Sequence, residues 1–523
     1  MGHRKPPWRV RAMRNTFKGL PRALHHVAYE SGLVVPGADG RAFTADHYFP
    51  VDPGDFPTLL VRTPYGRGLP WAALYGLLFA EQGFHVVLQD SRGPLGGPDS
   101  WRAEAADGHA AVAWLREQRW FTGVLGTVGP SYMGYTQWAL AASPPPELRA
   151  MVIQVGLSRP HDLYYTGGAF NLETALVATT MAVHQSRGLG AYLRAAIRAQ
   201  RRMDKAARDP SIKDAYVSVL GERAAVLEGV LAHPDPADPF WAGTDLTAVA
   251  DGLRIPTALI SGWYDVCLDQ TLRQHSRLVR SGAPTSLLVG PWTHTSAFDK
   301  GIKDVFADTL GWLNAHLRDD KSGLRPTQVR VWAGDGWRDL TGWPPAGNVR
   351  RHVRADGTLG DATSHEPIPL RQDPADPPPA LGGPRLGPRA GAKDNRELET
   401  RKDVLTFTSE PSTRPFEVLG PVRCEARISA DGAGADVFAR LCVVDTQGRS
   451  TNLCDGLLRL NTAPAGPVDI TVPMSATARM IHPGERIRLQ LSGAPSPRFA
   501  RRPAGPSVVS VHRASLVLGS AGD

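Results

Sequence analysis

Cysteine is scarce in this sequence. Its 523 residues contain four cysteines, Cys267, Cys424, Cys442 and Cys454, which lie far apart. No two of them form a CxxC pair, and none belongs to a cysteine and histidine group at the spacing of zinc ligands. We therefore predict that the protein has neither a disulfide scaffold nor a metal site, and that it works in a reducing, cytoplasmic environment. We also predict that it needs no organic cofactor.

Long apolar runs are also lacking. The longest one, at 69–80, reaches about a dozen residues, whereas a membrane-spanning helix needs about 20. The first 29 residues contain no continuous apolar stretch that ends at a small-residue cleavage site, so we expect no standard secretory signal. These absences predict a soluble protein without a membrane partner.

Acidic residues are missing from segment 1–29, which contains seven lysines and arginines. The formal net charge is +8, so the rest of the chain carries 8 − 7 = +1. No nucleic-acid-binding motif accompanies the basic segment, and we therefore expect no nucleic-acid partner. We interpret 1–29 as a basic, solvated and partly ordered N-terminal arm.

The composition, with 42% hydrophobic and 21% charged residues, is that of a globular protein with two or three domains. Between residues 30 and 155, short apolar runs alternate with helical patterns. Because parallel strands need crossover connections, this alternation predicts a parallel sheet with helices on both faces, the first part of an α/β domain. We predict strands at 57–62, 84–89, 126–129 and 148–155, and helices at 71–82, at 107–117 with Asp107 as the cap, and at 133–142.

Segment 156–245 has helical spacing and no clear strand pattern, so we predict a helical cap inserted into the α/β domain. The alternation resumes in 246–320, the second part of that domain. Strands are predicted there at 255–261 and 285–289, and helices at 270–280 and 304–316.

The composition changes again in 321–523, where proline and glycine become frequent. Short alternating runs at 329–332, 404–407, 437–444 and 486–491 predict an antiparallel sandwich or jelly roll. The stretch 373–393 is crowded with proline and glycine, and we expect it to be an irregular excursion.

Ser131 lies between glycines in 129–134, where a short predicted strand meets a predicted helix. Such a turn projects a serine hydroxyl as a nucleophile elbow, although Met133 departs from the common G-x-S-x-G pattern. Asp265 and His294 each follow a strand predicted in the same sheet. The carboxyl ends of parallel strands share one edge, so these three residues can converge as a triad. The alternative makes Asp265 a helix cap and His294 a surface residue.

The residue types suit acyl transfer. A serine hydroxyl is a poor nucleophile until an imidazole accepts its proton, and a carboxylate fixes the tautomer of that imidazole. The developing oxyanion needs donors. One candidate is the backbone N–H of Tyr132, and the second is the phenol of Tyr65, which follows the strand at 57–62.

Several segments in this order resemble the cocaine esterase and X-Pro dipeptidyl-peptidase family of serine hydrolases (the CocE/NonD type). The resemblance extends from about residue 30 to the C-terminus. It implies an α/β-hydrolase core, a helical cap and a C-terminal jelly roll of the galactose-binding type. It also implies that Ser131 is the nucleophile, that Asp265 and His294 complete the triad, and that Tyr65 and the Tyr132 amide form the oxyanion hole. The segments are 62–65, 89–93, 129–134, 136–138, 262–265, 290–294, 403–409 and 452–456.

One departure bears on the substrate. Asp265 is followed by Val266, Cys267 and Leu268. By the resemblance, relatives that hydrolyse α-amino acid esters carry acidic residues at these positions, and those acids bind the ammonium group of the substrate. The expected partner is therefore a small-molecule ester or amide, and ester hydrolysis through an acyl-enzyme is preferred. The alternatives are an X-Pro dipeptidyl-peptidase or amide acylase with the same triad, and a catalytically inactive ligand-binding protein. The oligomeric state is left open, with a homodimer as one option.

Two further expectations concern side chains near this site. Tyr164, Tyr165 and Phe170 could line an acyl pocket or belong to the packed core of the cap. Cys267 is expected to be a neutral, buried thiol rather than a second nucleophile.

Overall fold

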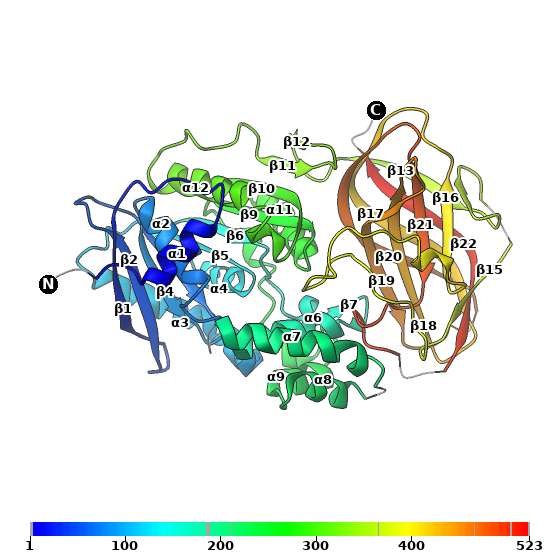
Figure 1. Cartoon of the computed structure of the whole chain (residues 1–523), viewed down its shortest axis with the longest axis horizontal. Coiled ribbons are helices and arrows are strands. Elements are labelled where there is room, and N and C mark those ends of the chain that lie inside the picture. The colour runs from blue at the N-terminus through cyan, green and yellow to red at the C-terminus, as the bar shows by residue number, and fades with distance from the viewer. Residues whose placement is uncertain are drawn as a thin grey trace.

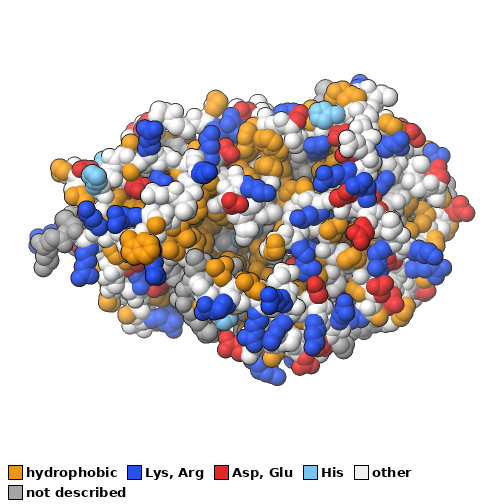
Figure 2. Space-filling view, in the orientation of Figure 1, with side chains coloured by type: hydrophobic (Ala, Val, Ile, Leu, Met, Phe, Trp, Pro, Cys, Tyr) orange, Lys and Arg blue, Asp and Glu red, His pale blue; other side chains and the backbone are white. Residues whose placement is uncertain are grey.

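The computed structural model describes residues 4–184, 189–209, 211–363, 366–464, 466–502 and 505–520. Figure 1 shows an α/β part, a group of helices beside it, and a separate β-rich part that contains the C-terminal strands. On the face drawn in Figure 2, charged side chains of both signs are scattered over the surface, and hydrophobic side chains gather around a hollow near the middle. No helix in the described ranges is long and apolar enough to cross a membrane.

The α/β part contains a ten-stranded sheet with the order β1-β2-β4-β3-β5-β6-β9-β10-β11-β12. The strands from β4 to β11 are parallel, and β1, β2 and β12 are antiparallel at the edges. The predicted parallel core is confirmed. The strands are β1 Val27–Pro36, β2 Ala42–Pro50, β3 Thr58–Thr63, β4 His85–Asp90, β5 Leu125–Pro130, β6 Leu148–Gln154, β9 Thr257–Tyr264, β10 Thr285–Thr293, β11 Val329–Trp332 and β12 Trp337–Leu340.

Helices cover both faces of this sheet, and each face has its own buried cluster. Phe79 and Phe306 belong to one cluster, and Val112 and Leu278 belong to the other. This is the packing that crossover connections produce. The helices are α1 Trp8–Thr16, the π-helix η1 Ala72–Leu77, α2 Leu78–Glu81, α3 Pro98–Arg116, α4 Tyr132–Ala141, α10 Val249–Gly252, α11 Leu268–Ser281 and α12 Ile302–Leu317.

The predicted helix start at Asp107 is wrong, because α3 already begins at Pro98. Proline at the first helical position has the required φ and needs no N–H partner, so the Gly97–Pro98 step starts the helix. Asp107 instead lies inside α3, fully buried, and accepts a hydrogen bond of 3.0 Å from Arg92. The sequence does not distinguish an aspartate that caps a helix from one that forms a buried ion pair inside it, and this is why the predicted helix start is wrong.

Helices fill the segment that we interpret as a cap, and they lie beside the α/β part in Figure 1. The sequence pattern missed a short hairpin, β7 Tyr165–Thr166 and β8 Ala169–Phe170. The remaining cap elements are α5 His161–Tyr164, α6 Leu172–His184, α7 Leu189–Ala206, α8 Ile212–Leu220, α9 Ala225–Ala232 and the 3-10 helix η4 Pro239–Trp241.

The hairpin contacts the C-terminal part closely. Its turn contains Gly167, whose φ is +54° and whose carbonyl accepts a hydrogen bond of 2.7 Å from the Arg459 N–H. A Cβ atom on Gly167 would lie 1.8 Å from the Leu457 carbonyl oxygen. Only glycine allows this approach of the two backbones.

The C-terminal part is an all-β domain, as predicted. Its sheet has the order β19-β18-β21-β16-β14-β13-β22-β17-β20, with β15 paired to β22, and it encloses a core that includes Leu441, Val472 and Leu516. All its strand pairs are antiparallel except β14 with β16. The strands are β13 Gly347–Val353, β14 Thr358–Gly360, β15 Ile368–Gln372, β16 Val404–Ser409, β17 Phe416–Ala430, β18 Ala435–Val444, β19 Ser450–Leu460, β20 Val468–Ile481, β21 Arg486–Ser492 and β22 Ser507–Ser520.

The assignment of the run at 329–332 to this domain is wrong. The run forms β11, which pairs in parallel with β10 of the first sheet, so that Val329 lies opposite Leu287. Its alternating burial reflects a position near the sheet edge, where one face of a strand is less covered. The change from one sheet to the other occurs between Leu340 and Gly347.

Candidate active site

Ser131 lies at a sharp turn between β5 and α4. Its φ of +57° and ψ of −122° are unusual for a residue with a side chain, and such strain is a recurrent feature of functional turns. The Ser131 N–H donates to the Gln154 carbonyl at 3.0 Å, which fixes the turn against β6. The start of α4 packs closely against the segment after β6, because Gly134 has no side chain there. A Cβ on residue 134 would come within 3.0 Å of Gly156.

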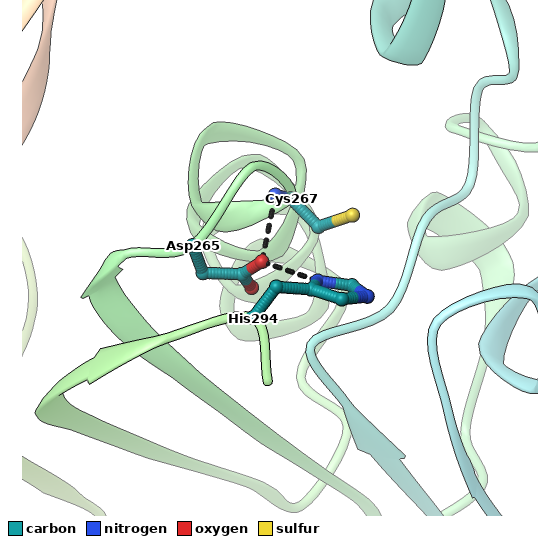
Figure 3. A group of neighbouring side chains, drawn as sticks. All are labelled: Asp265, Cys267 and His294. Atoms are coloured by element: carbon teal, nitrogen blue, oxygen red, sulfur yellow. Dashed lines mark hydrogen bonds and ion pairs between the residues drawn. The ribbon is translucent and has the colours of Figure 1, made fainter. Parts of the chain in front are cut away.

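Asp265 and His294 follow the ends of β9 and β10 and form a close pair. Imidazole Nδ1 of His294 donates to Oδ1 of Asp265 at 2.7 Å. Oδ2 of Asp265 accepts a hydrogen bond of 2.7 Å from Ser261, and its Oδ1 accepts a further bond of 3.0 Å from the Cys267 N–H. Figure 3 shows both hydrogen bonds to Oδ1, one from the Cys267 N–H and one from the imidazole. With Nδ1 protonated in this way, Nε2 of a neutral ring is an acceptor.

The structure brings the predicted site residues together in one pocket. Ser131, His294, Tyr65 and Tyr132 all line it, and Asp265 contacts His294 from behind. The Tyr65 phenol donates to Oγ of Ser131 at 3.3 Å. A hydroxyl, an imidazole and a phenol around one small space are suited to nucleophilic attack on a carbonyl.

The rest of the pocket wall is mainly apolar. Tyr164 belongs to the wall, whereas Tyr165 packs against Phe170 inside the cap, with ring centroids 5.5 Å apart. The C-terminal domain contributes Leu386, which sequence analysis missed because the irregular stretch around it has no periodicity. The other lining residues are Pro94, Leu95, Leu157, Leu163, Ala178, Thr179, Met181, Val226 and Val266.

A second cavity, of about 400 Å³, adjoins this pocket. Leu95 and Val226 line both of them. The second cavity continues outward between the end of α6 and the segment that connects α8 to α9, where Ala182 and Glu222 line it.

Three acids of the cap and of α11, Asp162, Glu173 and Asp269, have hydrogen-bond partners. Asp162 accepts a hydrogen bond of 2.9 Å from Arg273, and Glu173 contacts Arg385 through both oxygens, at 2.5 and 2.8 Å. Burial tends to raise the pKa of Asp162, but the neighbouring His161 and the charge of Arg273 outweigh it and lower that pKa. Asp269 accepts a hydrogen bond from Ser475 of the C-terminal domain at 3.1 Å.

A buried polar group that sequence analysis missed lies behind Tyr132. Glu104 is fully buried and accepts hydrogen bonds from Arg62 at 2.7 Å, from the Gly93 N–H at 3.2 Å and from the Tyr132 phenol at 3.2 Å. Burial, and then the charge of Glu104, raises the pKa of Tyr132 well above its ordinary value. The Tyr132 ring is thus anchored in the interior, and its N–H at the start of α4 needs a partner outside the helix.

Cys267 is the expected buried thiol. It is completely inaccessible, and burial followed by the charge of Asp265 raises its pKa well above the ordinary value for a cysteine. The thiol is therefore neutral at ordinary pH, and a neutral thiol is a poor nucleophile.

Comparisons with known proteins agree with this architecture. Residues 39–296 match the X-Pro dipeptidyl-peptidase (S15) family, and residues 310–514 match the X-Pro dipeptidyl-peptidase C-terminal non-catalytic domain. The chain is 29% identical to cocaine esterase from Rhodococcus sp. (strain MB1 Bresler) over 530 residues, which cover 90% of this chain and 92% of that protein.

Solved structures share the whole fold. An α-amino acid ester hydrolase is 18% identical, with a TM-score of 0.79 over 96% of this chain and 98% of that one. An aminopeptidase from a Thaumarchaeota archaeon of marine sediment is 21% identical, with a TM-score of 0.76 over 96% of this chain and 97% of that one. From its two matched domains and its relatives, this chain belongs to the serine hydrolase family of the X-Pro dipeptidyl-peptidases and cocaine esterase.

Proposed function

We propose that this serine hydrolase cleaves carboxylic esters of neutral acyl groups, with Ser131 as nucleophile, His294 as general base and Asp265 as its partner. The observation that carries the proposal is the position of the strained Ser131 turn, which shares one pocket with the His294–Asp265 pair. The family supports a serine hydrolase, and the geometry supports this assignment of roles.

In the first half-reaction, Oγ of Ser131 attacks the ester carbonyl carbon while Nε2 of His294 takes the hydroxyl proton. Asp265 stabilises the imidazolium that forms. The Tyr65 phenol and the Tyr132 N–H donate to the tetrahedral oxyanion. The carbon–oxygen bond to the leaving group then breaks, the imidazolium protonates the departing alcohol, and an acyl-serine remains.

In the second half-reaction, water attacks the acyl-serine. His294 accepts one proton of the water and returns it to Oγ of Ser131 when the carbon–oxygen bond to the serine breaks. The products are the free serine and a carboxylic acid. Besides the substrate and the attacking water, these steps involve the five residues already described.

The preference for a neutral acyl group follows from the pocket wall. An ammonium group that enters an apolar pocket loses its hydration and needs a carboxylate or several acceptors in exchange. Val266 and Leu386 offer neither, and the nearby Asp162 and Glu173 are already paired with arginines. Esters of α-amino acids and X-Pro amides, which carry such an ammonium, are therefore poorer substrates.

Two measurements test this proposal. A fluorophosphonate should label wild-type protein at Ser131 and leave Ser131→Ala unlabelled, whereas an inactive ligand-binding protein would not react at all. The second measurement compares kcat/KM for a p-nitrophenyl acyl ester, a phenylglycine ester and an Ala-Pro p-nitroanilide under one condition. Preference for the Ala-Pro substrate would replace the ester proposal with the dipeptidyl-peptidase alternative.

A further inference from the structure

Three side chains with metal-binding atoms lie together next to the pocket: Asp265, Cys267 and His294. One oxygen, the sulfur and one ring nitrogen all lie within 4.8 Å of one another. All three side chains are buried. In Figure 3 the Cys267 sulfur lies on the same side of Asp265 as the imidazole. The spacing along the chain did not predict this group, because it is assembled from the ends of two strands.

We propose that Asp265, Cys267 and His294 form an inhibitory site for a thiophilic divalent cation such as Zn²⁺ or Cd²⁺. The binding part of this inference is independent of the proposed function, and the inhibitory part rests on it. Among the residues that the structure describes, Asp265, Cys267 and His294 are the one group of three His, Cys, Asp or Glu side chains that lie close enough together to hold an ion.

The donor set suits these ions. Zinc takes cysteine sulfur, histidine nitrogen and carboxylate oxygen, and sites with three protein ligands keep a fourth position for water. With zinc–sulfur distances of about 2.3 Å and zinc–nitrogen or zinc–oxygen distances of about 2.1 Å, tetrahedral ligands lie about 3.5 Å apart. The three side chains therefore need to move by roughly an ångström or less to close around an ion. A sulfur ligand disfavours Mg²⁺ and Ca²⁺.

The neighbours of Asp265 hold the group in place. Its carboxylate accepts hydrogen bonds from Ser261 and from the backbone N–H of Cys267. Groups that orient a ligand in this way strengthen metal binding. The N–H of residue 267 is present whatever its side chain, so a substitution at Cys267 removes the sulfur and leaves this support of Asp265 in place.

Binding exchanges protons for the ion. The sulfur–hydrogen bond of Cys267 breaks, its proton passes to solvent, and bonds from the ion to sulfur, nitrogen and oxygen form. A divalent cation compensates for the thiolate charge that the buried site otherwise disfavours. No oxidant or reductant takes part.

Either imidazole nitrogen can serve as ligand, and both cases remove the general base. If the ion binds Nδ1, the neutral ring carries its proton on Nε2 and cannot accept one from Ser131. If the ion binds Nε2, the lone pair that would accept the proton is used. His294 is the member of the group that lines the pocket, so bound metal and bound substrate would compete for the same imidazole.

Cadmium titration of the full-length protein tests the binding part. A cadmium–thiolate bond has an ultraviolet charge-transfer absorption that is read without turnover. We expect this absorption in wild type and in Cys424→Ala, and its loss in Cys267→Ala and Cys267→Ser. Cys424 is a matched control because it is an equally buried free cysteine in the C-terminal domain.

Zinc inhibition tests the second part, with each variant compared with its own metal-free rate after equilibration. Both Cys267 variants should need at least about tenfold more zinc for half-inhibition, which corresponds to about 1.4 kcal/mol, and EDTA should restore the rate. Equal cadmium absorption in wild type and the Cys267 variants would overturn the site, as would unchanged zinc sensitivity. If the protein hydrolyses no ester, the proposed function fails, and the cadmium titration still decides the metal site.

Discussion

Arg385 and Glu173 form a buried ion pair that joins the C-terminal domain to the cap. The guanidinium contacts both carboxylate oxygens, and the two side chains are 0% and 3% exposed. Leu386, the next residue, lines the pocket beside Ser131. The pair therefore fixes one wall of the pocket, because it holds the irregular stretch of the C-terminal domain against α6.

Removal of the Arg385 side chain should strongly reduce the free energy of unfolding. Arg385→Met leaves Glu173 buried without its partner, and such a loss typically costs about 3–5 kcal/mol. We expect this decrease in the free energy of unfolding from urea titration, together with a higher KM for acyl esters. The double variant Arg385→Met, Glu173→Leu should recover most of the stability, because it leaves no unpaired charge. A double variant as unstable as the single one would contradict this account.

Substitution within the triad should abolish turnover without unfolding the protein. Ser131→Ala and His294→Ala should each reduce kcat by several orders of magnitude, since triad members act as a unit. Asp265→Asn should reduce kcat by about 10³-fold or more, because it favours the wrong imidazole tautomer. Circular dichroism serves as the control for folding. Near-normal hydrolysis by Ser131→Ala would show that the nucleophile is another residue.

The two tyrosines of the oxyanion hole should respond differently. Tyr65→Phe should lower kcat by about 10²-fold with little change in KM, as expected for the loss of one oxyanion donor. Tyr132→Phe keeps its backbone N–H, so its effect on kcat should be small. Its phenol, however, donates to the buried Glu104, and loss of that bond should reduce the unfolding free energy by about 1–3 kcal/mol. Equal losses of kcat at both positions would refute this division of roles.

A buried histidine should make stability depend on pH. Burial lowers the pKa of His275 to about 4. The unfolded chain binds a proton below its ordinary pKa of about 6.5, and the folded protein does not until about pH 4. The free energy of unfolding should therefore fall as the pH decreases from about 6.5 to 4, by up to about 1.4 kcal/mol per pH unit.

The variant His275→Gln should remove this contribution and flatten the dependence. Urea unfolding of wild type and variant at several pH values in that window measures the difference in slope. His26→Gln is a matched control, because it removes an exposed histidine in place of a buried one. An unaltered slope in His275→Gln would mean that other groups cause the acid sensitivity.

The accuracy with which the sequence predicts a strand depends on how that strand is buried. The predicted positions of β5 and β6 agree with the structure to within a residue or two, because both strands are fully or almost fully buried and lie between helical patterns. The prediction for β11, which lies next to the edge strand β12, gives the wrong domain, since its alternation resembles that of a sandwich strand. The alternation of apolar and polar residues along a strand indicates which side chains are buried, but it does not indicate which sheet the strand joins.

The candidate site shows the same limit. Ser131, Asp265 and His294 were selected because each follows a strand of one parallel sheet, and the structure places them around one pocket. Leu386 and Glu104 had no such signal. Leu386 lies in a proline- and glycine-rich stretch without periodicity, and Glu104 is an acid inside a helix whose burial depends on Arg62, distant in sequence.

The contact of Gly167 with the Leu457 backbone limits how the molecule can open. The hairpin β7–β8 and the C-terminal domain touch backbone to backbone, and the Arg459 N–H donates a hydrogen bond to the Gly167 carbonyl across this contact. A hinged lid that lifts the whole cap would have to pull this contact apart. A side chain at residue 167 would collide with the Leu457 carbonyl and should loosen the attachment of the hairpin to the C-terminal domain, although residue 167 lies outside the pocket that contains Ser131.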